Sequence, residues 1–278
     1  MIALVIPTIR PKNYGIFKKL WKHYLNGIQL IVIEDGKEPL VNGISVKGVM
    51  GEYSDLIYNF NSGVRNLGFA YISRYLKDID TIISLDDDVE PCGDTIKDHI
   101  NALNMKVPIT WMSTASRFTR GFPYRAREEA EVVLSHGGWR GVIDWDAPTQ
   151  LVQGNIPVKM YKGVIPKGCL FPFCSMNFAF KRKLLPYIYQ APMYGDINRF
   201  EDIWGGVEIK KDIDRKNWAA VTGYATVYHK RASNVWTNLI KEARGLKMNE
   251  EYGKDPYFNL FHEKRERWKE FIHKYEKS

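Results

Sequence analysis

Three apolar runs alternate with segments of helical spacing in the first 90 residues of this 278-residue chain. The runs cover residues 2–6, 28–33 and 81–85 (IALVI, IQLIVI and TIISL), and residues 14–25 and 62–76 lie between them. Short apolar runs predict buried strands, and apolar residues at helical spacing predict helices. The alternating order therefore predicts an α/β fold with a mostly parallel, doubly wound, Rossmann-like sheet.

Polar residues follow each predicted strand. Thr8 and Arg10 come after the first, Asp35 after the second, and residues 86–88 (DDD) after the third. In open α/β sheets, ligands bind at the carboxyl ends of the strands. We therefore expect these side chains to share one site.

The acidic triplet is a candidate for divalent-cation binding. Asp86, Asp87 and Asp88 offer the hard oxygen ligands that such cations prefer, although a solvated turn would have the same composition. His229 follows the β-prone residues 225–228, and an imidazole beside carboxylates would favour Mn²⁺. A single histidine can equally be a core or surface residue. We predict a metal site of Asp86, Asp88 and His229.

The sequence contains neither GxGxxG after its first strand nor GxxxxGK[ST], so it supports no dinucleotide Rossmann site and no P-loop. Arg65 and Asn66 lie near a predicted helix start, where a guanidinium and backbone N–H groups can meet phosphate. A capped surface helix is the alternative for these two residues.

The middle of the chain, residues 111–172, has weak periodicity and many Gly, Pro and aromatic residues, which predicts long functional loops. Trp139 and Trp145 lie beside carboxylates and amides there, a mixture suited to sugars, although ordinary core packing explains each tryptophan alone. Further on, Glu201 and Asp202 fit a helix N-terminus. Asp202 is also a candidate general base.

Arg120 and Arg127 frame the segment RGFPYRARE, residues 120–128. Paired arginines downstream of an acidic triplet suggest chemistry on a sugar nucleotide, and their ordinary role is to clamp phosphate. A guanidinium keeps its proton at neutral pH and is a poor nucleophile. Residue chemistry alone therefore favours the clamp.

The net charge of +8 would attract several kinds of anion, including nucleic acid. We expect no nucleic-acid partner, because the chain carries no recognised nucleic-acid motif. The longest apolar runs are too short to span a bilayer, and Met1 is followed directly by a strand without a basic leader. We expect no integral membrane association and a cytoplasmic location.

The chain is long enough for one large domain with an extension. We expect a nucleotide-sugar domain at residues 1–240 and a basic, amphipathic helical tail at residues 241–278. Phe261, Trp268, Phe271, Ile272 and Tyr275 form an apolar stripe at helical spacing in this tail. The stripe favours packing on the tail's own domain or on a second subunit, so a homo-oligomer is possible.

Nine ordered segments together resemble one family. They are VIPTIR, IEDG, DDDV, RGFPYRARE, SHGGW, DWDAPTQL, IPKGCLFPFCSMNFAF, RFEDIWGG and YHKRASN, and they span roughly residues 2–238. The chain resembles the reversibly glycosylated polypeptide, or UDP-arabinopyranose mutase, family. This resemblance implies a GT-A glycosyltransferase-like fold, a divalent metal that is Mn²⁺ or Mg²⁺, and interconversion of UDP-arabinopyranose and UDP-arabinofuranose.

The resemblance also implies roles for individual residues. Arg120 would match the arginine linked to reversible sugar attachment, and Arg127 the second arginine of that motif. Asp86, Asp88 and His229 would hold the metal. The residues that would grip UDP are Thr8, Arg10, Asp35, Arg65, Asp86 and Asp87. Some relatives only glycosylate themselves, so the alternative is a self-glycosylating protein, or a UDP-sugar glycosyltransferase with a separate acceptor.

Overall fold

The computed structural model describes residues 1–35, 44, 46–113, 115, 118–154, 156, 159–230 and 233–277. The first part of the chain contains strands β1 (Ile2–Thr8), β2 (Ile28–Glu34), β3 (Thr81–Leu85) and β4 (Val89–Pro91), and helices α1 (Pro11–Trp21), α2 (Val46–Met50), α3 (Asn66–Tyr75) and α4 (Thr95–Leu103). The three apolar runs are strands, as predicted. The helix that begins near Arg65 is α3.

The second part contains strands β5 (Lys106–Val107), β6 (Ala130–Gly141), β7 (Gly163–Ile165), β8 (Asn177–Lys181) and β9 (Ala219–His229). Its helices are α5 (Ala147–Gln153), α6 (Glu201–Arg215), α7 (Val235–Glu250) and α8 (Tyr257–Glu276). Short 3₁₀ turns lie at residues 22–24, 51–56, 62–65, 124–126 and 182–184.

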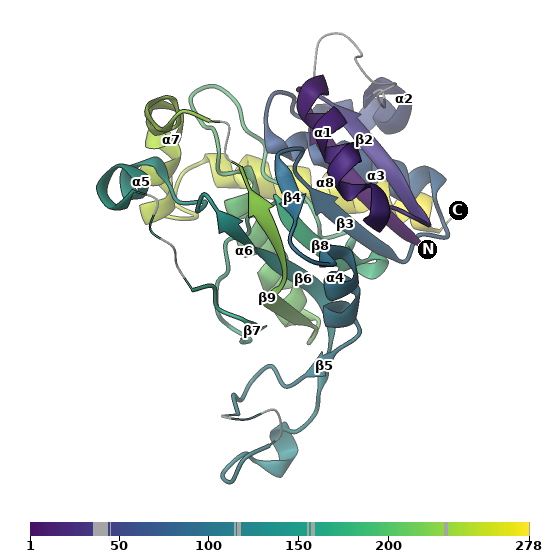
Figure 1. Cartoon of the computed structure of the whole chain (residues 1–278), viewed down its shortest axis with the longest axis vertical. Helices are drawn as coiled ribbons and strands as arrows, with labels where there is room; N and C mark the ends of the chain where they lie inside the picture. The colour runs from purple at the N-terminus through teal and green to yellow at the C-terminus, as the bar shows by residue number, and fades with distance from the viewer. Residues whose placement is uncertain are drawn as a thin grey trace.

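The central sheet is mixed and has the order β2-β1-β3-β8-β6-β9-β4 (Figure 1). β1 runs parallel to β2 and β3, and β6 runs parallel to β9. β8 is antiparallel to both β3 and β6, while β4 and β7 are antiparallel to β9 and β5 is antiparallel to β6. The α/β class is confirmed. The prediction of a mostly parallel sheet holds only for β2-β1-β3 and the β6-β9 pair.

Helices cover both faces of this sheet (Figure 1). On one face, the buried side chains of α3, α6 and α8 join alternate residues of β1 and β3, such as Val5 and Ile82, in one apolar cluster. On the other face, α1 and α4 pack against the opposite residues of those strands, such as Leu4 and Ile83. Because side chains alternate along a strand, β1 and β3 contribute to both cores.

The prediction of long loops over residues 111–172 was wrong for β6, which lies inside the sheet between β8 and β9. The glycine residues of this strand contributed to that prediction. In the fold, a Cβ on Gly137 would lie 2.0 Å from Asn177 Nδ2, so glycine permits the close approach of β8. The Asn177 amide also donates to the Gly138 carbonyl at 2.9 Å.

The apolar stripe of the tail packs on the chain's own core. Phe261, Trp268, Phe271 and Ile272 are fully buried in the same cluster as α3 and α6, and the Trp268 indole donates to the Leu185 carbonyl at 3.0 Å. The boundary that we predicted at residue 240 falls within α7. The division into two domains stays a prediction.

Candidate functional site

A cavity of about 590 Å³ opens beyond the carboxyl ends of β1, β3, β6 and β9. Its acidic lining consists of Asp86, Asp88, Asp144, Asp146, Glu201, Asp202 and Glu242. Its aromatic lining consists of Trp139, Trp145, Tyr161, Phe171, Phe173 and Phe200, and Arg10, Arg199, His136 and His229 also reach it. Carboxylates beside aromatic faces suit a ligand with both hydroxyl groups and apolar ring faces.

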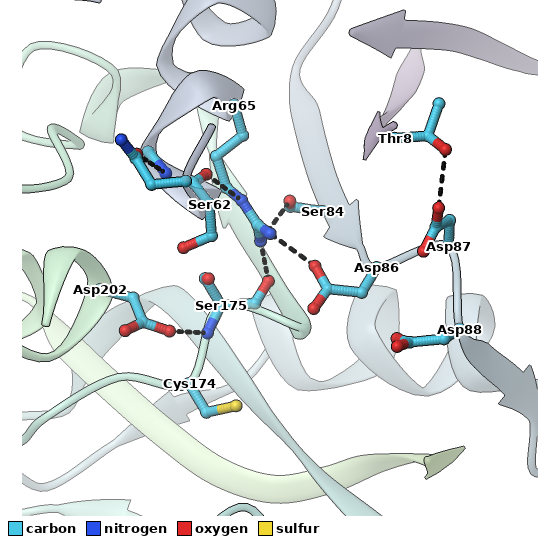
Figure 2. Close-up of polar contacts among 12 residues, drawn as sticks. Thr8, Ser62, Arg65, Ser84, Asp86, Asp87, Asp88, Cys174, Ser175 and Asp202 are labelled. Carbon is cyan, nitrogen blue, oxygen red and sulfur yellow. Dashed lines mark hydrogen bonds and ion pairs between the residues drawn. The ribbon is translucent and has the colours of Figure 1, made fainter. Parts of the chain in front are cut away.

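The middle carboxylate of the triplet is turned inward. Thr8 Oγ1 donates to Asp87 Oδ2 at 2.6 Å, and Figure 2 shows Asp87 turned toward Thr8. The Arg10 guanidinium also pairs with Asp87 and reaches Asp88 Oδ2 at 3.2 Å. Asp87 is buried, and it holds Thr8 and the cavity-lining Arg10 in place. The predicted UDP contacts of all three residues stay predictions.

Arg65 is a fully buried guanidinium that supports Asp86. It donates to Ser62 O at 3.0 Å, to Ser84 Oγ at 3.2 Å, to Ser175 O, and to Asp86 Oδ1 at 2.5 Å (Figure 2). A buried arginine is stable only when its donors are satisfied, and these acceptors satisfy it without a ligand. A phosphate contact of Arg65 stays a prediction.

Asp88 and His229 have the features of cation ligands. Asp88 Oδ1 is buried without a hydrogen-bond partner, and burial, together with the charge of Asp86, raises the Asp88 pKa to about 6. His229 Nδ1 lies 2.9 Å from the Val142 carbonyl, which can only accept, so in the neutral ring Nδ1 carries the proton and the lone pair is on Nε2. A cation would satisfy both atoms.

The described residues contain no group of three or more His, Cys, Asp or Glu side chains placed to hold a metal ion. The predicted set of Asp86, Asp88 and His229 is therefore not a closed protein cage. Magnesium-type sites commonly use one or two carboxylates and complete their shell with substrate phosphates and water. The metal site stays a prediction that fits this open type.

Asp202 faces the triplet from the other side of the cavity (Figure 2). Burial, together with the negative charge of Glu201, raises its pKa to about 7. Its Oδ2 accepts the Ser175 N–H at 2.8 Å and its Oδ1 accepts the Ile203 N–H at 2.9 Å. Asp202 therefore combines a fixed orientation with a proton affinity suited to general acid–base work at neutral pH. Its catalytic role stays a prediction.

Glu201 starts α6, as predicted, and ties that helix to the 3₁₀ turn at residues 62–65, which precedes α3. Its Oε1 accepts both the Ser62 hydroxyl at 2.5 Å and the Ser62 N–H at 3.0 Å. Its Oε2 is buried without a hydrogen-bond partner. This charge is held beside Asp202 and contributes to the raised Asp202 pKa.

His136 was not identified from the sequence as a site residue. Its Nδ1 lies 3.0 Å from Thr222 Oγ1, and its Nε2 accepts the Cys174 N–H at 3.0 Å. Burial lowers the His136 pKa to about 3, so the ring is neutral and Nε2 can accept. His136 and Asp202 thus fix two successive N–H groups, those of Cys174 and Ser175, in the cavity wall.

Arg199 and Glu242 were also missed. Arg199 has a positive φ of 64°, an uncommon conformation for a residue with a side chain, and its Nε donates to Glu242 Oε1 at 2.8 Å. Glu242 Oε2 accepts the Ala147 N–H at 2.7 Å, which joins α7 to the first turn of α5. No local pattern signals this contact, because the partners are 43 residues apart.

Asp35 lies at the end of β2, as predicted, but it is not among the residues that line the cavity. It accepts the Phe60 N–H at 2.6 Å, and burial raises its pKa to about 6. Gly36, which follows in the IEDG segment, lies outside the described residues, as do Arg231 and Ala232 of YHKRASN. The predicted UDP contact of Asp35 stays a prediction.

Arg120 and Arg127 are not among the cavity-lining residues. They belong to an arm, which we define as residues 108–113, 115 and 118–129, between β5 and β6. Figure 1 shows this segment extending away from the sheet. Arg120 is exposed, and Arg127 lies over the Tyr124 ring at 3.9 Å from its centroid. The structure thus brings together Asp86, Asp88, Asp202 and His229, but not Asp35, Asp87 or these two arginines.

The fold and the cavity define an α/β protein with a cavity at the carboxyl ends of its strands, where carboxylates and aromatic rings face one space. A model of the reversibly glycosylated polypeptide family matches residues 1–267. The chain belongs to this family.

Three plant proteins illustrate the relationship. UDP-arabinopyranose mutase 3 of Arabidopsis thaliana is 34% identical over 90% of this chain and 76% of its own length. UDP-arabinopyranose mutase 1 of Arabidopsis thaliana is 31% identical over 88% of this chain and 75% of its own length. A probable UDP-arabinopyranose mutase 1 of Pisum sativum is 32% identical over 90% and 75% of the two chains.

Among solved structures, a Drosophila β1,4-galactosyltransferase 7 mutant in complex with manganese, UDP-Gal and xylobiose is similar at a TM-score of 0.41 and 13% identity. The match covers 85% of this chain and 72% of that one. In the part of the chain that the structure describes, no helix is long and apolar enough to cross a membrane.

Proposed function

We propose that this protein is a UDP-L-arabinopyranose mutase, which interconverts UDP-arabinopyranose and UDP-arabinofuranose on a GT-A-like fold. Membership of the family, together with relatives that bear this name, supports the proposal. The observation that carries it in the structure is the carboxylate-rich, aromatic-lined cavity at the strand ends. The aromatic rings can pack on the sugar and uracil faces while the carboxylates accept hydrogen bonds from the sugar hydroxyl groups.

A divalent cation, Mn²⁺ or Mg²⁺, would be held by Asp88 Oδ1 and His229 Nε2, with Asp86 beside them, and would supply charge neutralisation to the diphosphate. The orphaned Asp88 oxygen and the fixed His229 tautomer support this assignment. Asp87, Thr8 and Arg10 would hold the neighbouring carboxylate in place through their mutual hydrogen bonds.

Between release and return of UDP, the sugar would stay covalently bound to Arg120. The bond from the anomeric carbon to the phosphate oxygen breaks, its electron pair leaves with UDP, and a guanidinium nitrogen of Arg120 bonds to that carbon while Asp202 takes the displaced proton. The bond between the anomeric carbon and the ring oxygen O5 then breaks, and O5 takes up a proton to become a hydroxyl. The hydroxyl on C4 attacks the anomeric carbon and gives up its proton, which closes the furanose. A phosphate oxygen of UDP attacks the anomeric carbon, the bond to nitrogen breaks, and Asp202 returns its proton to the departing Arg120 guanidinium.

Incubation with UDP-L-arabinopyranose and Mn²⁺, with and without EDTA, tests this function. Anion-exchange chromatography should show a new UDP-arabinofuranose peak that EDTA abolishes. If only UDP and sugar-labelled protein form, the chain is a self-glycosylating relative. If product requires an added acceptor, it is a glycosyltransferase.

The role of Arg120 is tested separately by Arg120→Lys. Lysine keeps the positive charge but loses the planar guanidinium, so we expect UDP-sugar binding within about twofold of wild type and loss of isomerisation. Arg125→Lys makes the same change at a neighbouring exposed arginine and should retain turnover. Wild-type turnover in Arg120→Lys would exclude the arginine-linked intermediate.

A further inference from the structure

The position of the arm relative to the cavity poses a geometric problem for the proposed reaction. Ala130 begins β6 directly after the arm, and Gly141 at the other end of β6 pairs with His229. A strand rises about 3.3 Å per residue, so the start of β6 lies roughly 30 Å from the His229 end, allowing for the two irregularities in its pairing. Figure 1 shows the arm at the start of β6, away from the carboxyl ends of β6 and β9.

The arm cannot bring Arg127 to the His229 end of its own cavity while β6 is intact. Arg127 is three residues before Ala130, and a fully extended segment of that length spans only about 11 Å. Arg120 is farther along the chain, but it would have to unfold the arm completely. The arm has its own packing, in which the tilted rings of Phe118 and Phe122 have centroids 4.7 Å apart and the Trp111 ring lies 6.2 Å from Phe122.

We propose that the arm of one copy of this chain delivers Arg120 to the cavity of a second copy. This inference rests on the proposed function, because it concerns the partner that completes the same site. Two copies related by a twofold axis could exchange arms, so that each site would combine carboxylates from one copy with arginine from the other.

Two observations favour a second copy as the occupant. The arm exposes large apolar side chains, with Trp111 48%, Met112 71% and Tyr124 84% exposed, and contiguous exposed apolar groups mark interaction surfaces. The described part of the arm carries three arginines, at positions 120, 125 and 127, against two carboxylates, at 128 and 129, whereas the cavity lining carries seven carboxylates against two arginines. An aromatic and cationic arm therefore complements an aromatic and acidic cavity in charge and in polarity.

The chemistry between copies would be the balanced exchange described above. The copy that binds UDP-arabinose releases UDP with the electron pair of the broken bond, and its Asp202 takes the guanidinium proton. The new bond joins the anomeric carbon to Arg120 of the other copy. No oxidant or reductant is required, and return of UDP reverses the step.

Complementation between two inactive variants tests this arrangement. Arg120→Lys has an intact cavity and a defective arm, and Asp88→Asn has the reverse, so each should be inactive alone. When they are co-expressed with different tags, half of random dimers are mixed and each mixed dimer has one complete site, which predicts about a quarter of wild-type turnover per subunit. Asp202→Asn replaces Asp88→Asn if the latter does not fold.

The matched control pairs Arg120→Lys with the double variant Arg120→Lys/Asp88→Asn, which has no intact arm and should restore nothing. A second readout follows radiolabelled sugar onto protein, which in the mixture should appear on the Asp88→Asn copy. An active wild type without restored turnover or label in the mixture overturns delivery between copies, and so does full activity of a monomer.

The two proposals fail in different ways. If wild type forms no UDP-arabinofuranose, the mutase function is wrong, while label on the Asp88→Asn copy would still support delivery between copies. If the wild type is active and the mixture shows neither furanose product nor label, delivery between copies is wrong and the mutase function stands.

Discussion

The Asp202→Asn substitution tests whether ionisation of a buried carboxyl group in the cavity destabilises the folded protein. Asparagine resembles the protonated acid in shape and can still accept one backbone N–H, from Ser175 or Ile203. It cannot ionise. The variant should therefore gain stability relative to wild type as the pH rises, while losing the general acid–base group that the proposed reaction uses.

The sign and size follow from the pKa. The Asp202 pKa rises from 3.8 to about 7 on folding, so between these values the folded state binds more protons than the unfolded state, and wild-type stability falls as the pH rises through this window. Between pH 5 and pH 8 the wild-type unfolding free energy should fall by about 3 kcal/mol, because the folded-state pKa lies about two units above pH 5. Water in the cavity weakens the effect, so we expect about 1–3 kcal/mol.

Urea unfolding at pH 5 and pH 8, monitored by tryptophan fluorescence, measures the difference. The unfolding free energy of Asp202→Asn minus that of wild type is compared at the two pH values. Titrating groups that the two proteins share contribute equally to both and cancel in this difference. Asp196→Asn, which alters an exposed carboxylate, is the control and should show no such change. An equal difference at both pH values for Asp202→Asn would refute the reasoning.

Three further predictions address the metal, the buried guanidinium and the tail. Asp88→Asn should abolish Mn²⁺-dependent UDP binding in calorimetry, and unchanged Mn²⁺ affinity would remove Asp88 from the metal shell. Arg65→Met should lower the unfolding free energy by about 3–5 kcal/mol in urea titration, since it leaves Asp86 and the Ser175 carbonyl without their buried donor. Trp268→Ala should cost about 3–5 kcal/mol by the same assay because it empties a fully buried site, and a loss below 1 kcal/mol would contradict the packing of α8 on the core.

The sequence was informative where local pattern and strand topology agree. Apolar runs predicted β1, β2 and β3, and the parallel pairing of these strands brings the residues that follow them to one edge of the sheet. The meeting of the acidic triplet with Asp202 and His229 is consistent with this reasoning. Asp87 shows its limit, because the pattern does not tell which of three adjacent carboxylates turns away from the cavity.

The sequence was less informative where long-range packing decides. β6 was missed because its polar and glycine residues, including His136 and Gly137, face neighbouring strands at close range, which weakens the apolar signal. The contact of Arg199 with Glu242 depends on how α7 packs beside α5, and nothing within a short window of sequence encodes that.

The arm illustrates how missing one strand changes a mechanistic prediction. As long as residues 111–172 are taken as loops, Arg120 and Arg127 can be placed in the cavity without strain. Once β6 is recognised, Arg127 is tied to the end of that strand that lies far from His229. A reaction that uses both the acids and the arm then needs either unfolding of the arm or a second copy. The packing of the Trp111, Phe118 and Phe122 rings opposes unfolding, so the geometry favours the second copy.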